Sequence, residues 1–204
     1  MELPESSIKE FQKLWEKQYG KKLTSSEARE SATNLIGFFQ VLIDIDTKER
    51  GRKARLKDAP KGFHLYDGVY SCRVCRQTIS GEQTWYDKNG IKCLDCQRAL
   101  DKRLIPASVC KNSDSWYSLH EFDFYFSVKS STILKFVREG KLKMRRIPNE
   151  KGGIHERIFI IKDNPGVLPH KPRSRLMPTA GNRVTTEYEK VAFPLIDDLE
   201  KPQT

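Results

Sequence analysis

Apolar residues recur at helical spacing near the start of the chain, with lysine and glutamate between them, and predict an amphipathic helix over residues 6–19 that ends at Gly20. Thr24 and Glu27 match a capping box, which predicts the start of a second helix with a wide apolar face. Because the connection is short, the two helices should pack as an antiparallel hairpin within residues 1–46. We expect the wide face to be buried against another copy of the chain or another domain, in preference to a ligand groove.

The apolar pattern breaks in two other regions of the chain. Residues 47–66 are basic and contain glycine and proline, which predicts a linker, either a flexible tether or an arm that orders on nucleic acid. Residues 165–204 are rich in proline and basic side chains over their first part, and we expect a mostly flexible, extended tail. Within this tail, residues 185–196 could add a short strand or a partner-binding segment.

Residues 111–164 predict a helix, a turn, a second helix and a hairpin. Ser118 and Glu121 match another capping box, and Gly140 ends the second helix. Two apolar segments then bracket a glycine-rich turn, which predicts a β-hairpin. This order of elements is that of a winged helix-turn-helix. The expected helices span residues 119–126 and 133–139, and the expected strands span residues 142–147 and 154–161.

Four cysteines form two Cys-x-x-Cys pairs: Cys72 with Cys75, and Cys93 with Cys96. Two such pairs at this separation can place four thiolates around one tetrahedral zinc ion. We therefore expect one structural Zn²⁺ ion in a module that spans residues 67–110. Two disulfides would need an oxidising compartment, and an iron centre is a further alternative.

The chain between the two cysteine pairs predicts a hairpin, because an Asn-Gly turn separates two short strand-like segments. The second pair lies at the start of a short predicted helix, where backbone N–H groups favour thiolate. A turn with two ligands, a hairpin and a helix with two ligands form the treble-clef arrangement. This stretch resembles GATA-type zinc fingers, although treble clefs also serve as protein or RNA contact modules. The residues that carry the resemblance are Cys72, Cys75, Trp85, Gly90, Cys93 and Cys96.

Two phrases in the predicted winged helix carry a second resemblance. Residues 128–133 read Val-Lys-Ser-Ser-Thr-Ile, and residues 138–142 read Arg-Glu-Gly-Lys-Leu. With the basic hairpin that follows, they resemble excisionase and MerR-type winged helices. The resemblance implies that the second helix enters the major groove of double-stranded DNA, while the wing contacts the backbone or an adjacent minor groove. The candidate nucleic-acid-binding residues are Lys129, Ser130, Ser131, Thr132, Lys135, Arg138, Arg145, Arg146, Lys151 and Arg157.

Composition is typical of a soluble protein, and its charge permits binding to a polyanion without showing it. The 204 residues carry a formal net charge of +10, and the isoelectric point is about 9.4. With 37% hydrophobic and 31% charged residues, the chain can build several small cores, which predicts a multi-module α+β protein. No apolar run is long enough for a spanning helix, and no hydrophobic signal segment opens the chain, so we expect a cytoplasmic location and no membrane partner.

Together these patterns predict a non-enzymatic, zinc-stabilised DNA-binding protein. It would act as a transcriptional regulator, or as an accessory factor for recombination or DNA transfer, of a bacterial, phage or mobile element. The alternatives are a protein-interaction adaptor and an RNA-binding protein in which Trp85 and Tyr86 stack on a single strand. No paired carboxylates, triad or phosphate loop indicates an enzyme. Cys110 has no histidine placed to activate it and is predicted to be a buried free thiol.

Overall fold

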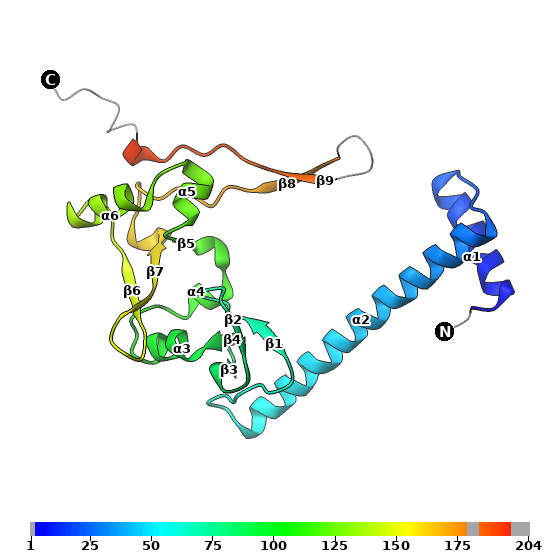
Figure 1. The fold of residues 1–204 in the computed structure, drawn as a ribbon, viewed down its shortest axis with the longest axis horizontal. Helices are drawn as coiled ribbons and strands as arrows, with labels where there is room; N and C mark the ends of the chain where they lie inside the picture. Colours follow the sequence, from blue (N-terminus) through cyan, green and yellow to red (C-terminus); the bar gives the residue numbers. More distant parts are fainter. Residues whose placement is uncertain (1–2, 179–183, 197–204) are drawn as a thin grey trace. The chain divides into compact units, whose positions relative to one another are not determined.

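The computed structural model describes residues 3–178 and 184–196 and has the mixed α+β fold that the sequence predicts. The chain divides into two compact units, one up to Ala59 and the other from Pro60 onward. Figure 1 labels the helices and strands of both units. The first unit is helical, and the described strands all belong to the second unit.

The first unit is a pair of helices, α1 (Glu5–Tyr19) and α2 (Ser25–Asp58). Gly20 ends α1 with a left-handed backbone (φ 67°), a conformation that costs glycine little. The predicted capping box opens α2: Thr24 Oγ1 accepts a hydrogen bond from the Glu27 N–H, and the Glu27 carboxylate accepts one from the Thr24 N–H. The buried residues between the two helices are Ile8, Ala28 and Ala32.

Helix α2 corrects the prediction of a linker at residues 47–66. The helix continues without interruption through residues 47–58. Lysine, arginine and glutamate are good helix formers, and charges here pair at helical spacing, as Asp46 does with Arg50 at 2.7 Å. The basic composition therefore belongs to a solvated helix and not to an irregular tether.

Short antiparallel strands surround the cysteine pairs at the start of the second unit. Strand β1 pairs with β2, and β3 and β4 form the predicted tight hairpin. Helix α3 follows β4 directly, so the second cysteine pair lies at a helix N-terminus as predicted. The elements are β1 (Val69–Ser71), β2 (Thr78–Ser80), the 3₁₀ turn η1 (Gly81–Gln83), β3 (Thr84–Asp87), β4 (Gly90–Cys93), α3 (Leu94–Asp101) and α4 (Ser108–Lys111).

The predicted helix-turn-helix and hairpin are present, and one additional strand joins them. Helices α5 and α6 are separated by a turn at Ser127, which has a left-handed backbone (φ 55°). The additional strand β5 pairs with β7 and includes Ser118, so the helix predicted to cover residues 119–126 begins two residues later. The sheet order is β5-β7-β6. The elements are η2 (Ser113–Ser115), β5 (Trp116–Ser118), α5 (Glu121–Phe126), α6 (Ser130–Arg138), β6 (Arg145–Pro148), β7 (Ile154–Ile160) and η3 (Ile161–Asp163).

One hydrophobic core is shared by the cysteine region and the three-stranded sheet. Trp116 on β5, Ile147 on β6 and Ile158 on β7 are fully buried in the same cluster as the cysteines, and α3 packs against β6. The predicted module boundary at residue 110 therefore falls inside one core. The other buried members of this cluster are Cys72, Val74, Ile79, Cys93, Cys96, Ala99, Ile105, Val109, Cys110 and Ile160.

Much of the predicted flexible tail, residues 165–204, is folded. Two strands of the tail pair antiparallel, and residues after the second strand pack against the rest of the second unit. Phe193 and Leu195 are buried in the core of the helix-turn-helix, where the Phe193 ring lies 5.5 Å from that of Phe122. The strands are β8 (Ser174–Pro178) and β9 (Val184–Tyr188). Residues 179–183 and 197–204 of the predicted tail lie outside the described residues.

Candidate metal centre and nucleic-acid interface

The sulfur atoms of the paired cysteines converge on one point. All four Sγ atoms lie within 4.8 Å of one another, and those of Cys75 and Cys93 are 3.7 Å apart. Sulfurs placed about 2.3 Å from one zinc ion at tetrahedral angles lie about 3.8 Å from each other, whereas a disulfide needs about 2.05 Å. None of the five cysteines forms a disulfide. The cluster therefore has the geometry of a site for one metal ion, and its sulfur donors suit Zn²⁺.

The local backbone of each pair orients its sulfurs. Cys93 is the last residue of β4 and the N-cap of α3, and its Sγ accepts a hydrogen bond from the Cys96 N–H at 3.4 Å. In the first pair, the Sγ of Cys72 accepts one from the Val74 N–H at 3.4 Å. Arg76, with a left-handed backbone (φ 61°), then turns the chain toward β2. Because N–H donors favour a charged sulfur, both turns stabilise thiolates.

The four thiols of the cluster influence one another's ionisation. Hydrogen bonding from Cys75, and then from Cys93 and Cys96, holds the pKa of Cys72 far below its ordinary value. Hydrogen bonding with Cys72 raises the pKa of Cys96 far above its ordinary value. One thiol of the cluster therefore ionises readily. The negative charge of that thiolate disfavours ionisation of the other thiols unless a cation lies among the sulfurs.

A histidine from the wing also contacts the cluster, and the sequence did not indicate it. His155 on β7 places Nε2 3.4 Å from Cys93 Sγ and Nδ1 3.3 Å from Asp95 Oδ2. Its side chain is 11% exposed. In metal sites, partners of this kind hold the ligands in position. No local signal could have identified His155, because 62 residues separate it from Cys93.

Helix α6 has one apolar face and one polar, basic face. Ile133 and Phe136 are buried in the core, at 0% and 1% exposure. Ser131, Lys135 and Arg138 are exposed and follow at intervals of four and three residues, which places them on one side of the helix. The helix contains no acidic residue. These three candidates therefore form a positively charged face toward solvent.

The remaining helix candidates lie at the N-terminus of α6. Lys129 precedes the helix and is exposed, whereas Ser130 and Thr132 are half-buried in its first turn. Beyond the helix, Glu139 lies 3.7 Å from Lys135 and balances part of its charge. The structure thus brings the predicted α6 candidates together on one end and one face of a single helix.

The wing candidates divide into surface residues and one fixed residue. Arg146 and Lys151 are exposed, and Arg157 is half-buried. Arg145 donates from Nε to Asp163 Oδ2 at 2.6 Å, and its Nη1 donates to a backbone carbonyl at 3.1 Å. The hydrogen bond with Asp163 raises the pKa of Arg145. The Arg145 guanidinium is therefore held by hydrogen bonds within the protein, although its side chain is 37% exposed, while Arg146 and Lys151 remain available at the surface.

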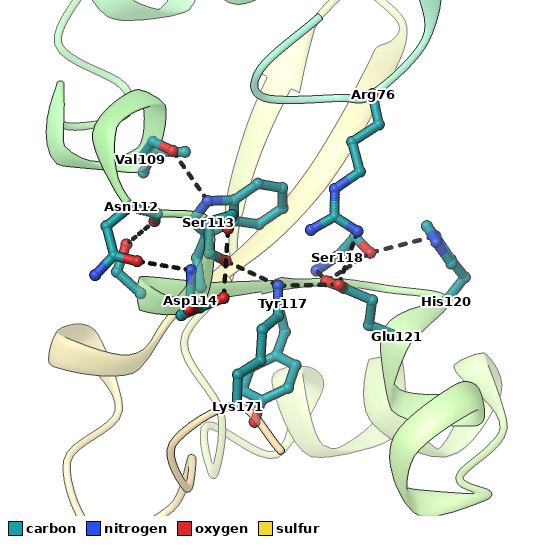
Figure 2. A network of polar contacts seen from close by, with 12 residues as sticks. Arg76, Val109, Asn112, Ser113, Asp114, Tyr117, Ser118, His120, Glu121 and Lys171 are labelled. Carbon is teal, nitrogen blue, oxygen red and sulfur yellow. Dashed lines mark hydrogen bonds and ion pairs between the residues drawn. The ribbon is translucent and has the colours of Figure 1, made fainter. Parts of the chain in front are cut away.

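A buried ion cluster holds the start of α5 in place (Figure 2). The Glu121 side chain is 5% exposed, and its Oε1 lies 2.9 Å from both Arg76 Nη1 and Lys171 Nζ. Lys171 also donates to the Ser113 carbonyl at 2.8 Å. Burial raises the pKa of Glu121, but the hydrogen bond from the Ser118 N–H and the pairing with Lys171 outweigh it, so the pKa is lowered overall. The cluster links the first cysteine turn, the helix-turn-helix and the segment before β8.

Two other predictions from the sequence have clear outcomes. Tyr86 is 4% exposed, so its ring cannot stack on a nucleic-acid base, and Trp85 is half-buried. Cys110 is a buried free thiol, as predicted, and its burial raises the pKa to about 11. Cys110 therefore stays neutral at physiological pH and is not among the four sulfurs that converge.

Comparisons with protein-family models, with curated proteins and with solved structures give no match for this chain. The resemblances to GATA-type zinc fingers and to excisionase and MerR-type winged helices therefore stay predictions. Among residues 3–178 and 184–196, no helix combines the length and the apolar character that crossing a membrane requires.

Proposed function

We propose that this protein binds double-stranded DNA through α6 and the β6–β7 wing, on a scaffold that one structural zinc ion stabilises. The observation that carries the proposal is the exposed face of α6, where Ser131, Lys135 and Arg138 lie opposite the buried Ile133 and Phe136. A helix fits the major groove of B-DNA, which is about 12 Å wide. Hydroxyl, ammonium and guanidinium donors on such a helix can reach base edges and phosphates.

The wing extends the proposed surface. Arg146 and Lys151 are exposed on the hairpin that follows α6. In winged helices, basic side chains at this place contact the DNA backbone or an adjacent minor groove. The net charge of +10 adds long-range attraction to a polyanion. The role that fits these features is an excisionase-like regulator or accessory factor for recombination or DNA transfer of a bacterial, phage or mobile element.

The zinc ion would support DNA binding indirectly, by stabilising the core that positions the wing strands. Cys72 and Cys96 lie in the same buried cluster as Ile147 and Ile158 of the wing strands. Structural zinc supplies on the order of 10 to 16 kcal/mol of apparent binding energy. That energy would hold the wing strands against the cysteine region, and with them the basic surface.

Binding to a pool of random-sequence duplexes, measured by fluorescence anisotropy, tests the proposal. The double variant Lys135→Ala with Arg138→Ala should bind at least about tenfold more weakly, because each side chain loses a base or phosphate contact. The control, Lys9→Ala with Lys13→Ala, removes the same charge from exposed positions of α1, which is not part of the proposed surface. It should keep nearly full affinity.

Salt dependence gives a second measurement of the same surface. With about six phosphate contacts, affinity should fall on the order of a thousandfold between about 50 and about 200 mM salt. A flat salt response, or equal losses of affinity in the two double variants, would overturn DNA binding through α6.

Stronger competition by structured RNA than by duplex DNA would also overturn DNA binding through α6, in favour of the RNA-binding alternative. Retention of a protein partner by the double variant, with no duplex binding by the wild type, would favour the adaptor.

A further inference from the structure

Helix α2 has a large apolar surface over its middle third. Eight large apolar side chains between residues 35 and 45 are each 38–59% exposed. At about 3.6 residues per turn, they cover more than half of the helix circumference. Gln40 and Asp44 lie on the remaining polar side, where they hydrogen-bond to each other at 3.0 Å. The eight side chains, which we call the α2 apolar surface, are Leu35, Ile36, Phe38, Phe39, Val41, Leu42, Ile43 and Ile45.

The α2 apolar surface continues the seam along which α1 packs. Ile8 of α1 is buried against Ala28 and Ala32, and Arg29 pairs with Glu5 at the start of α1. Because α1 has 15 residues and α2 has 34, α1 covers only the N-terminal part of α2 (Figure 1). A helix with apolar residues around most of its surface is stable in water when other elements bury it.

We infer that the α2 apolar surface pairs with the same surface of a second copy of this chain, with the two α2 helices antiparallel. Large side chains have areas of roughly 200 Å². At the observed exposures the surface therefore amounts to on the order of 700 Å² per copy, close to the ~800 Å² per partner of a standard stable interface. Two copies therefore present matching apolar surfaces of about the size that a stable interface needs. The inference is independent of DNA binding.

The charges of the α2 segments that precede and follow the apolar surface favour the antiparallel orientation. Residues 48–57 contain six basic side chains and one acidic side chain. A parallel pair would set two such stretches side by side, and like charges repel. An antiparallel pair centred near Gln40 instead sets each stretch alongside Glu27 and Glu30 of the other copy, where opposite charges meet.

Sedimentation equilibrium of the full chain tests the pairing. The wild type should have twice the 23.7 kDa mass of one chain at micromolar concentrations. Phe39→Glu with Leu42→Glu should be monomeric, because it places charges inside the pair. Gln40→Glu with Thr47→Glu adds the same charge at exposed positions and should remain dimeric. A wild-type monomer with the expected helical content, or a dimer that survives Phe39→Glu with Leu42→Glu, would overturn the inference.

Cross-linking of the wild type tests the orientation without any variant. A carbodiimide joins lysine amines to carboxylates in direct contact, and mixing ¹⁴N- and ¹⁵N-labelled protein identifies links between copies. Antiparallel pairing should link Lys53 of one copy to Glu27 or Glu30 of the other. Within one helix, Lys53 and Glu27 are about 39 Å apart, so such a link must join two copies. Links between copies confined to residues 46–53 would indicate parallel helices and overturn the orientation.

Discussion

The imidazole of His155 lies 3.4 Å from the sulfur of Cys93, although 62 residues separate the two in the sequence. The contact joins β7, a strand of the wing, to the cysteine that ends β4 and caps α3. The metal centre and the wing also share one hydrophobic core. A change at the metal centre should therefore affect the wing, and a change in the wing should affect the metal centre.

Replacing His155 with alanine should weaken metal retention about tenfold to a hundredfold, because the ligand sulfur loses a partner that positions it. The rate at which a chromogenic chelator takes zinc from the protein measures the effect. His120→Ala, at an exposed histidine away from the sulfurs, is the matched control and should release zinc at the wild-type rate. Equal release from His155→Ala and the wild type would contradict the coupling.

Removing the metal should expose five thiols and not four. Cys110 lies in the same buried cluster as Cys72 and Cys96, and burial raises its pKa to about 11. Without the metal, the core loses on the order of 10 kcal/mol or more of support. All five cysteines should then react with a disulfide reagent, whereas the metal-bound protein, with one zinc per chain by mass spectrometry, should react slowly. Reaction of four thiols with Cys110 still protected would mean that the core survives metal loss.

Replacing Glu121 with glutamine should lower the free energy of unfolding by about 3 kcal/mol at neutral pH, because the charge of Lys171 stays buried without its carboxylate. Folding lowers the pKa of Glu121 below its ordinary value of 4.5. The carboxylate's contribution is therefore complete above about pH 4.5 and is lost as the pH falls through the lowered folded-state pKa. Urea unfolding at a series of pH values should show the difference from wild type shrinking in acid. Glu150→Gln, at an exposed carboxylate, should change little at any pH.

Replacing Gly51 with alanine should stabilise α2 by about 1 kcal/mol, because alanine is the better helix former and a Cβ at this position meets no atom within 4 Å. Gly20→Ala should instead lower the stability of the protein, because the left-handed backbone (φ 67°) at the end of α1 is strained for a residue with a side chain. Thermal unfolding followed by circular dichroism measures both. No gain from Gly51→Ala would contradict a continuous helix through residues 47–58.

The parts of this protein that the sequence determined are those with local causes. The capping box of Thr24 and Glu27 opens α2, the Asn-Gly turn closes the β3–β4 hairpin, and each Cys-x-x-Cys pair sits in its own short turn. These interactions act between residues a few positions apart, so residue type and spacing are sufficient to predict them. The candidate metal centre and the helix-turn-helix elements belong to this class.

The tertiary structure alone decided which distant residues meet. It placed His155 beside Cys93, buried Lys171 against Glu121 and merged the cysteine region with the wing strands into one core. Apolar burial is non-directional, so a sequence pattern indicates that a face is buried but not against which partner. Residues 47–58 were wrongly predicted to be a linker because a charged helix that buries few side chains has no periodic apolar pattern. Only the structure shows that α2 continues through them.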